Sequence, residues 1–179
     1  MYRRYAYRGR VGKYSNETVC TNIGVTDTKD GGAPLTDNPI TIVPATTVLG
    51  NRKVKNFTLK FTAHLTDDPV IGVLAYVPEG TTMNRPTVTG PIQSLYEPNQ
   101  NVIATFIIPP TCIRGQNATV SSSESPQTVT VSTRLARNLN TGDSIQLCLV
   151  SPNGIVAGDG TADNPPAVIC GTVNYSIKY

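Results

Sequence analysis

The chain has 179 residues and a net charge of +3, and only 15% of its residues are charged. This length suits one domain of ordinary size. No run of about eighteen apolar residues occurs, so we expect no membrane-spanning helix and no membrane insertion. Thr, Asn, Pro, Gly and Val are plentiful, a composition that favours strands and turns over helices.

The first fourteen residues carry five positive charges and no carboxylate, so the rest of the chain sums to −2. Arginines alternate with tyrosines here, and there is almost no aliphatic side chain to bury. Residues 1–14 are therefore predicted to form a mobile arm. Because guanidinium groups bind phosphate and tyrosine rings stack on unpaired bases, we expect the arm to bind a polyanion. A solvated tail or an expression remnant is the alternative.

Eight strand-like segments follow the arm, with turn-rich loops between them. They span residues 18–26, 40–49, 54–63, 70–77, 102–108, 128–136, 144–150 and 168–178. The third alternates apolar and polar residues, which is typical of a half-buried antiparallel strand. The fourth is apolar on both parities, as expected of a central strand that is covered on both faces. Pro44 interrupts the second, which is therefore expected at a sheet edge or to carry a bulge, because proline cannot donate to a ladder.

Eight short strands and no helix-period segment predict an all-β, two-sheet sandwich or barrel over residues 15–179. Among eight-stranded solutions we favour the antiparallel jelly roll. One sheet then contains the first, eighth, third and sixth segments, and the other contains the second, seventh, fourth and fifth. The second segment is an edge strand in this arrangement, in agreement with Pro44. Three long loops, 27–39, 109–127 and 151–167, are expected at one end of the sandwich.

One face of the first sheet is predicted to be cationic. Its outward parity includes Lys60, Arg134 and Lys178, with Thr, Asn and Ser between them and no Asp or Glu. An ordinary solvated face mixes the two signs of charge. A face whose charges are all positive is predicted to face the phosphates of a nucleic acid. Chance placement of three charges is the alternative.

The sequence contains no pattern of catalytic chemistry. His64 is the one histidine, and a lone histidine is more often a surface residue than a catalyst or ligand. No serine lies in a nucleophile elbow and no glycine-rich phosphate loop is present, so we expect no enzyme, no cofactor and no bound metal. Cys20, Cys112, Cys148 and Cys170 lack metal-ligand spacing and are predicted to be free thiols, with Cys148 and Cys170 in the core.

Four stretches carry a family resemblance. They are the opening residues 1–13, the stretch LGNRKVKNF at 49–57, the hairpin LNTGDSI at 139–145 and the last strand, which ends at Tyr179. With them the chain resembles, over essentially its whole length, the capsid proteins of small circular single-stranded DNA viruses that encode a replication initiator, the circovirus-like group.

The resemblance implies a jelly-roll subunit of a small icosahedral shell with about 60 copies, a virion protein that packages single-stranded nucleic acid. In that family the arm lies inside on the genome, and the cationic sheet face lines the lumen. The side chains expected to contact nucleic acid are then Arg3, Arg4, Arg8, Arg10, Lys13, Lys60, Arg134 and Lys178. The arm is shorter and less arginine-rich than is usual in the family. This puts a nuclear localisation signal in doubt and leaves the nucleus open as the site of assembly in the host cell; no receptor motif carries over.

Two other interpretations stay open from the sequence. A secreted or cell-surface β-sandwich binding module, such as a lectin or adhesin, predicts oxidised cysteines and glycans on the Asn-x-Ser/Thr triplets. The alternative is the capsid protein of a small RNA virus or satellite virus, in which the same cationic groups would bind a different genome.

Overall fold

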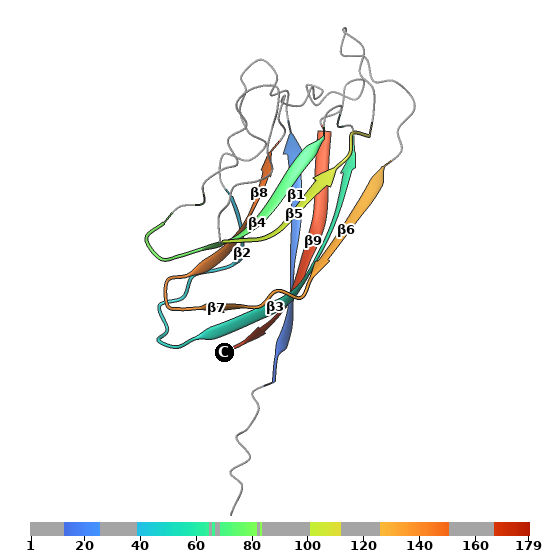
Figure 1. Cartoon of the computed structure of the whole chain (residues 1–179). Coiled ribbons are helices and arrows are strands. Elements are labelled where there is room, and N and C mark those ends of the chain that lie inside the picture. Colours follow the sequence, from blue (N-terminus) through green and yellow to red (C-terminus); the bar gives the residue numbers. More distant parts are fainter. Residues whose placement is uncertain are drawn as a thin grey trace, which may run out of the picture.

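The computed structural model of the chain describes residues 13–25, 39–64, 66, 69–81, 83, 101–111, 126–150 and 167–179. These residues form an all-β sandwich of two antiparallel sheets (Figure 1). The strands are β1 (Ser15–Val25), β2 (Ile40–Val43), β3 (Arg52–His64), β4 (Val70–Val77), β5 (Val102–Ile108), β6 (Gln127–Thr133), β7 (Arg137–Leu139), β8 (Ser144–Val150) and β9 (Ala167–Lys178). The described part of the chain contains no helix long and apolar enough to span a membrane.

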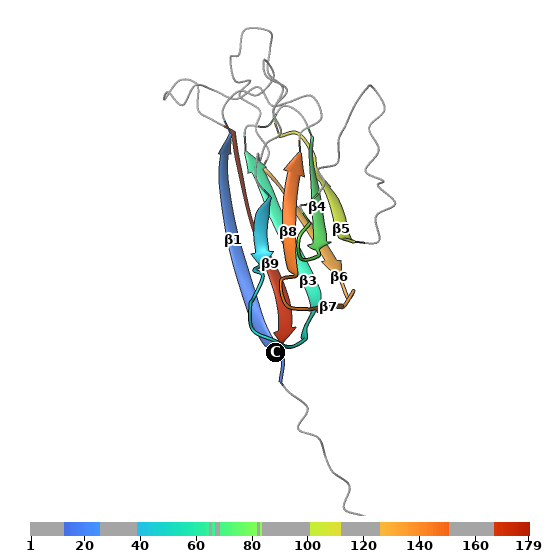
Figure 2. The ribbon, with the colours of Figure 1, turned by 90° about the vertical axis from the view of Figure 1, so that its left-hand side faces the viewer.

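The five-stranded sheet has the order β1-β9-β3-β6, with β7 also paired to β3, and the four-stranded sheet has the order β2-β8-β4-β5. In Figure 2 the four-stranded sheet faces the viewer, and most of the other sheet lies behind it. Each sheet brings together the segments that the sequence assigns to it. The described residues form nine strands rather than the predicted eight, because β7 pairs separately with the start of β3.

The two ends of the sandwich differ. β1, β3, β5 and β8 all end at one end, which we call the loop end (Figure 1). The three long loops predicted to share an end follow β1, β5 and β8 and so leave from this end, although most of their residues lie outside the described ones. At the opposite end, which we call the terminal end, β1 begins beside the last residues of β9, with Ser15 opposite Ile177.

Two stacked rings lie in the core between the sheets. Phe61 of β3 and Phe106 of β5 have ring centroids 5.1 Å apart and planes inclined by 18°. Gly171 of β9 lies opposite Phe61, and Gly72 of β4 lies opposite Phe106. A side chain at either glycine would collide with the facing ring. One glycine in each sheet therefore makes the space that the ring pair fills.

Several strand boundaries differ from the prediction, including the start of β1 and the end of β2. β1 begins at Ser15 rather than at residue 18, because its polar first residues are held by pairing with β9. β2 ends at Val43, immediately before Pro44. It is an edge strand of the four-stranded sheet, as predicted.

The prediction that Cys170 lies in the core is wrong. Cys148 is fully buried, but Cys20 and Cys170 are exposed, and all three are free thiols. Strand β9 alternates, and Cys170 follows the buried Ile169, so its side chain points outward.

We expect Gly171→Ala to lower the free energy of unfolding by about 1–3 kcal/mol, the usual cost of overpacking a core. The new methyl group would meet the Phe61 ring and the carbonyl oxygen of Lys60, which is backbone and cannot rotate away. Urea unfolding measures the loss. Thr172→Ala, at the next and outward-facing residue, is the matched control and should change stability by less than about 0.5 kcal/mol. Equal losses in the two variants would contradict this account of the core.

Candidate nucleic-acid interface

The outer face of the five-stranded sheet is the surface that points away from the core. Residues that lie opposite each other on neighbouring strands share one face of a sheet. Lys60 of β3 lies opposite Thr172 of β9 and Thr130 of β6. All three therefore point outward, since the next residue of β3, Phe61, is buried.

Short polar side chains cover most of this face and bond to one another across the strands. The hydroxyl of Thr18 donates to the Oδ1 atom of Asn174 at 2.6 Å, and the hydroxyls of Thr62 and Thr128 lie 2.8 Å apart. Such short side chains leave the long lysine and arginine side chains as the groups that project furthest from the sheet.

Three of the predicted cations that the structure describes lie on this face. Lys60 and Arg134 are exposed, and Lys178 is half-buried at the end of β9. Lys13 is exposed just before β1. The remaining predicted contacts lie outside the described residues: Arg3, Arg4, Arg8 and Arg10.

Two further lysines lie on the outer face and were missed in the sequence. Regular alternation would give Lys53 and Lys55 the same parity as the buried Phe57 and point them into the core. Instead Lys53 is exposed and lies opposite Lys178, and Lys55 lies opposite Ser176. Both belong to the same surface as Lys60.

A β-bulge at Asn56 causes this change of direction. The register between β3 and β9 shifts between Lys55 and Thr58, and Asn56 has a φ of 56°. A bulge inserts one residue into a strand and so reverses the alternation of its side chains. Val54 and Phe57, three residues apart, are consequently both fully buried. A valine between two lysines was the sequence signal for this break in alternation.

The cations are densest at the terminal end. Lys53 and Lys178 lie directly opposite each other, and like charges in this position destabilise a sheet. The Lys55 ammonium group lies 3.9 Å from the centre of the Tyr14 ring, a cation–π contact. Tyr14 therefore joins the start of the described chain to the cationic face.

The outer face carries no carboxylate among the described residues. Glu17 is exposed on the edge strand β1, but it lies opposite the buried Tyr175 and so has inward parity. Glu79 follows β4 of the other sheet, and Asp143 is buried. The described residues of this face thus include five cations and no carboxylate, and an electrostatic field of one sign suits a polyanion.

A buried arginine fixes the first residue of β3 at the terminal end. Nη1 of Arg52 donates to the carbonyl oxygen of Pro44 at 2.8 Å, and Nη2 donates to the carbonyl oxygen of Asp143 at 2.9 Å. Arg52 thereby ties the five-stranded sheet to segments that lead out of β2 and into β8.

The Asp143 carboxylate is the centre of a second set of hydrogen bonds. Its Oδ2 atom accepts from the Tyr76 hydroxyl and from the backbone N–H of Asn140, both at 2.7 Å. Its Oδ1 atom accepts from the backbone N–H of Glu79 at 3.1 Å. Burial alone would raise the pKa of Asp143, but these hydrogen bonds and the Arg52 charge outweigh it, so the pKa lies below its ordinary value of 3.8. Burial, together with the bond to this carboxylate, raises the pKa of Tyr76 to about 12.

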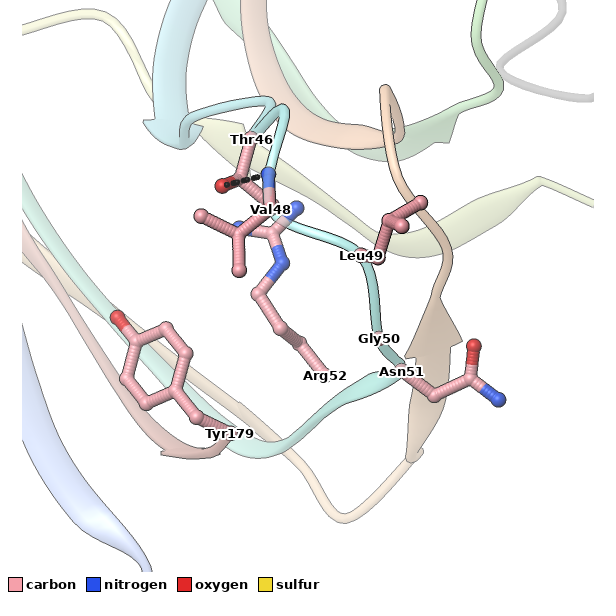
Figure 3. Close-up of a pocket in the computed structure, with 7 residues that line it drawn as sticks. All are labelled: Thr46, Val48, Leu49, Gly50, Asn51, Arg52 and Tyr179. Atoms are coloured by element: carbon pink, nitrogen blue, oxygen red, sulfur yellow. Dashed lines mark hydrogen bonds between the residues drawn. The ribbon is translucent and has the colours of Figure 1, made fainter.

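An apolar corner lies beside Arg52. Val48, Leu49 and Tyr179 are 73%, 90% and 82% exposed, and they line a pocket of about 210 Å³ with Thr46 and Arg52 among its walls. Figure 3 shows the Arg52 side chain running toward Thr46 and Val48, with the Tyr179 ring to one side. Exposed apolar groups gathered in one place are typical of a contact surface.

Most groups on the outer face are ammonium, guanidinium, hydroxyl and amide groups, and the exposed thiols of Cys20 and Cys170 lie among them. No set of three or more His, Cys, Asp or Glu side chains within the described ranges is placed to hold a metal ion. No protein-family model matches the chain, and no curated protein sequence matches it either. The geometry of the face is therefore what supports a function.

We expect Asp143→Asn to lower the free energy of unfolding at pH 7 by about 3 kcal/mol, because it removes a buried charged acceptor. A depressed carboxyl pKa stabilises the fold fully above the unfolded-state value, which is 3.8 for Asp143, and this contribution is lost as the pH falls through the lower folded-state pKa. Unfolding in urea between about pH 5 and pH 2 should therefore show a loss in the native protein that the variant lacks.

Tyr76→Phe serves as the control for this experiment, because it removes one hydrogen bond and keeps the carboxylate. It should cost about 1 kcal/mol at pH 7. If the native protein and the Asn variant lose stability in parallel on acidification, Asp143 is not the group responsible.

Proposed function

We propose that this protein is a structural capsid protein of a small circular single-stranded DNA virus of the circovirus-like group. In this proposal the subunits assemble into a small icosahedral shell, and the outer face of the five-stranded sheet lines its lumen and holds single-stranded nucleic acid. The observation that carries the proposal is the outer face itself, with five described cations and no described carboxylate. The protein is then a component of the virion, assembled in the host cell.

The strand order supports a jelly roll as the fold. A jelly roll of eight strands pairs the first, eighth, third and sixth in one sheet, and the second, seventh, fourth and fifth in the other. The observed order is the same when β7 is counted as an addition beside β6. Both sheets are antiparallel throughout the described residues.

The amount of charge supports nucleic acid as the partner. Each phosphate that a lysine or arginine neutralises releases a condensed counterion, and this release drives binding. Five cations on the outer face and five in the first fourteen residues would neutralise roughly 600 phosphates in a shell of about 60 copies. The contact between Tyr14 and Lys55 places the start of the described chain beside the same face, so that both sets of charge can act on one ligand.

The apolar corner supports self-assembly. A closed shell needs contacts between copies of the chain, and apolar surface is what such contacts bury. Val48, Leu49 and Tyr179 offer that surface at the terminal end. We assign the corner to a second copy of this chain as part of the proposal.

The nucleic-acid role is tested by replacing Lys53, Lys55 and Lys60 together with glutamine in the full chain. The expected result is a lower ratio of absorbance at 260 nm to that at 280 nm in purified particles. For a single-stranded probe, the slope of log affinity against log salt should become shallower by about 2, since three phosphate contacts are lost.

The matched control replaces the same three lysines with arginine, which keeps every charge. The arginine variant should retain its nucleic acid, and deletion of residues 1–14 should lose it while assembly persists. A glutamine variant that carries as much nucleic acid as the arginine variant would refute the assignment of this face.

The assembly role is tested by Leu49→Asp, which places a charge in the apolar corner. Because Leu49 is 90% exposed, the subunit should fold normally, whereas a buried subunit contact would be broken. Size-exclusion chromatography and negative-stain microscopy should then show small species in place of shells. Leu135→Asp, at an exposed leucine outside the corner, is the control; shells formed equally by both variants would contradict the assigned contact.

A further inference from the structure

The bulge at Asn56 also opens a pocket on the cationic face. β3 pairs with β6 as far as Phe57 opposite Thr133, and it pairs with β7 from Val54 opposite Arg137. The ladder on this side of β3 is therefore interrupted at the bulge. A surface pocket of about 420 Å³ lies at the interruption, within the size range of pockets that bind small molecules.

The side chains around this pocket are suited to an anion. Outward-facing Asn56, Thr58, Ser132 and Arg134 line it, so its walls offer an amide, two hydroxyls and a guanidinium group. The Thr58 and Ser132 hydroxyl oxygens lie 3.3 Å apart across β3 and β6. A guanidinium group can donate two parallel hydrogen bonds to a phosphate, which a point charge such as an ammonium group cannot do.

The backbone of Asn56 adds an independent observation. Among the described residues it is the one non-glycine with a positive φ. Glycine adopts this conformation at no steric cost, whereas asparagine is one of the few other residues that tolerate it. Asn56 thus combines an uncommon backbone conformation with a side chain that can form hydrogen bonds at the edge of a cationic pocket. Residues in such conformations are frequent at ligand-binding sites.

We propose that this pocket is a discrete phosphodiester subsite that holds one nucleotide unit of a single-stranded nucleic acid in each subunit. Arg134 pairs with the phosphate, and Asn56, Thr58 and Ser132 donate the remaining hydrogen bonds. The inference rests on the proposed function of the outer face and goes beyond it, because a diffuse cationic field would leave the strand free to slide. A subsite fixes the strand at one point of each subunit.

The test uses the full-length protein and fluorescein-labelled hexathymidylate, with affinity measured by fluorescence anisotropy at fixed salt. Asn56→Asp keeps the size of the side chain and tolerates the left-handed backbone, but it places a carboxylate inside the pocket. Thr130→Asp places the same charge on the same face, opposite Lys60, at a residue that does not line the pocket. The affinity should fall about tenfold more in Asn56→Asp than in Thr130→Asp.

Arg134→Lys provides a second comparison that keeps the charge of every subunit. It should weaken binding of the probe about fivefold, through loss of the bidentate contact, whereas Glu17→Asp, which also keeps its charge but has inward parity on β1, should leave the affinity unchanged. This pair decides the matter if circular dichroism shows that Asn56→Asp does not fold.

The outcomes separate the subsite from the function of the face. Equal losses in the two aspartate variants, with no effect of Arg134→Lys, would overturn the subsite and leave the outer face as a diffuse binding surface. Failure of the native protein to bind hexathymidylate would overturn both. A selective loss in the pocket variants supports the subsite.

Discussion

The reversal of side-chain alternation at Asn56 is the constraint on which the rest of the structure depends. Val54 and Phe57 are both buried, and they can be so only because one extra residue lies between them and the register shifts. Without that residue, Lys53 and Lys55 would enter the core, where unpaired charges are very costly. With it, β3 contributes three lysines to one surface and none to the other. The bulge also interrupts the ladder to β6 and β7, so it creates the pocket as well as the charge.

The two sheets have outer faces of opposite character. On the four-stranded sheet, Ile71, Val73 and Val150 have the parity that points away from the Phe61–Phe106 pair, yet all three are buried. This agrees with β4 being apolar on both parities. On the five-stranded sheet the corresponding surface is polar, cationic and open. Among the described residues, the cationic surface is therefore confined to one layer of the sandwich.

Much of the fold was accessible from the sequence, because it depends on local alternation and on proline. β4, β5 and β8 have the predicted bounds, and Pro44 correctly marked an edge strand. The polar start of β1 was missed because pairing with β9, rather than local pattern, makes it a strand. Cys170 was placed in the core because its neighbours are apolar, although its own parity is outward.

The candidate site was only partly accessible for the same reason. Lys60, Arg134 and Lys178 follow from simple alternation, but Lys53 and Lys55 required a break in that alternation to be recognised. The pocket depends on where β6 stops and β7 starts along β3, which no local pattern records.

The direct opposition of Lys53 and Lys178 has a thermodynamic consequence. The two lysines occupy opposite positions on neighbouring strands, so repulsion between their charges slightly destabilises the fold for as long as no anion lies over them. An anion that neutralises the pair relieves this repulsion and stabilises the folded state by mass action. Added salt then has two opposite effects. It screens the repulsion and so stabilises the ligand-free fold, but it also weakens the binding of a polyanion to the same surface. If the face binds a polyanion as proposed, folding and ligand binding are coupled through this pair of side chains.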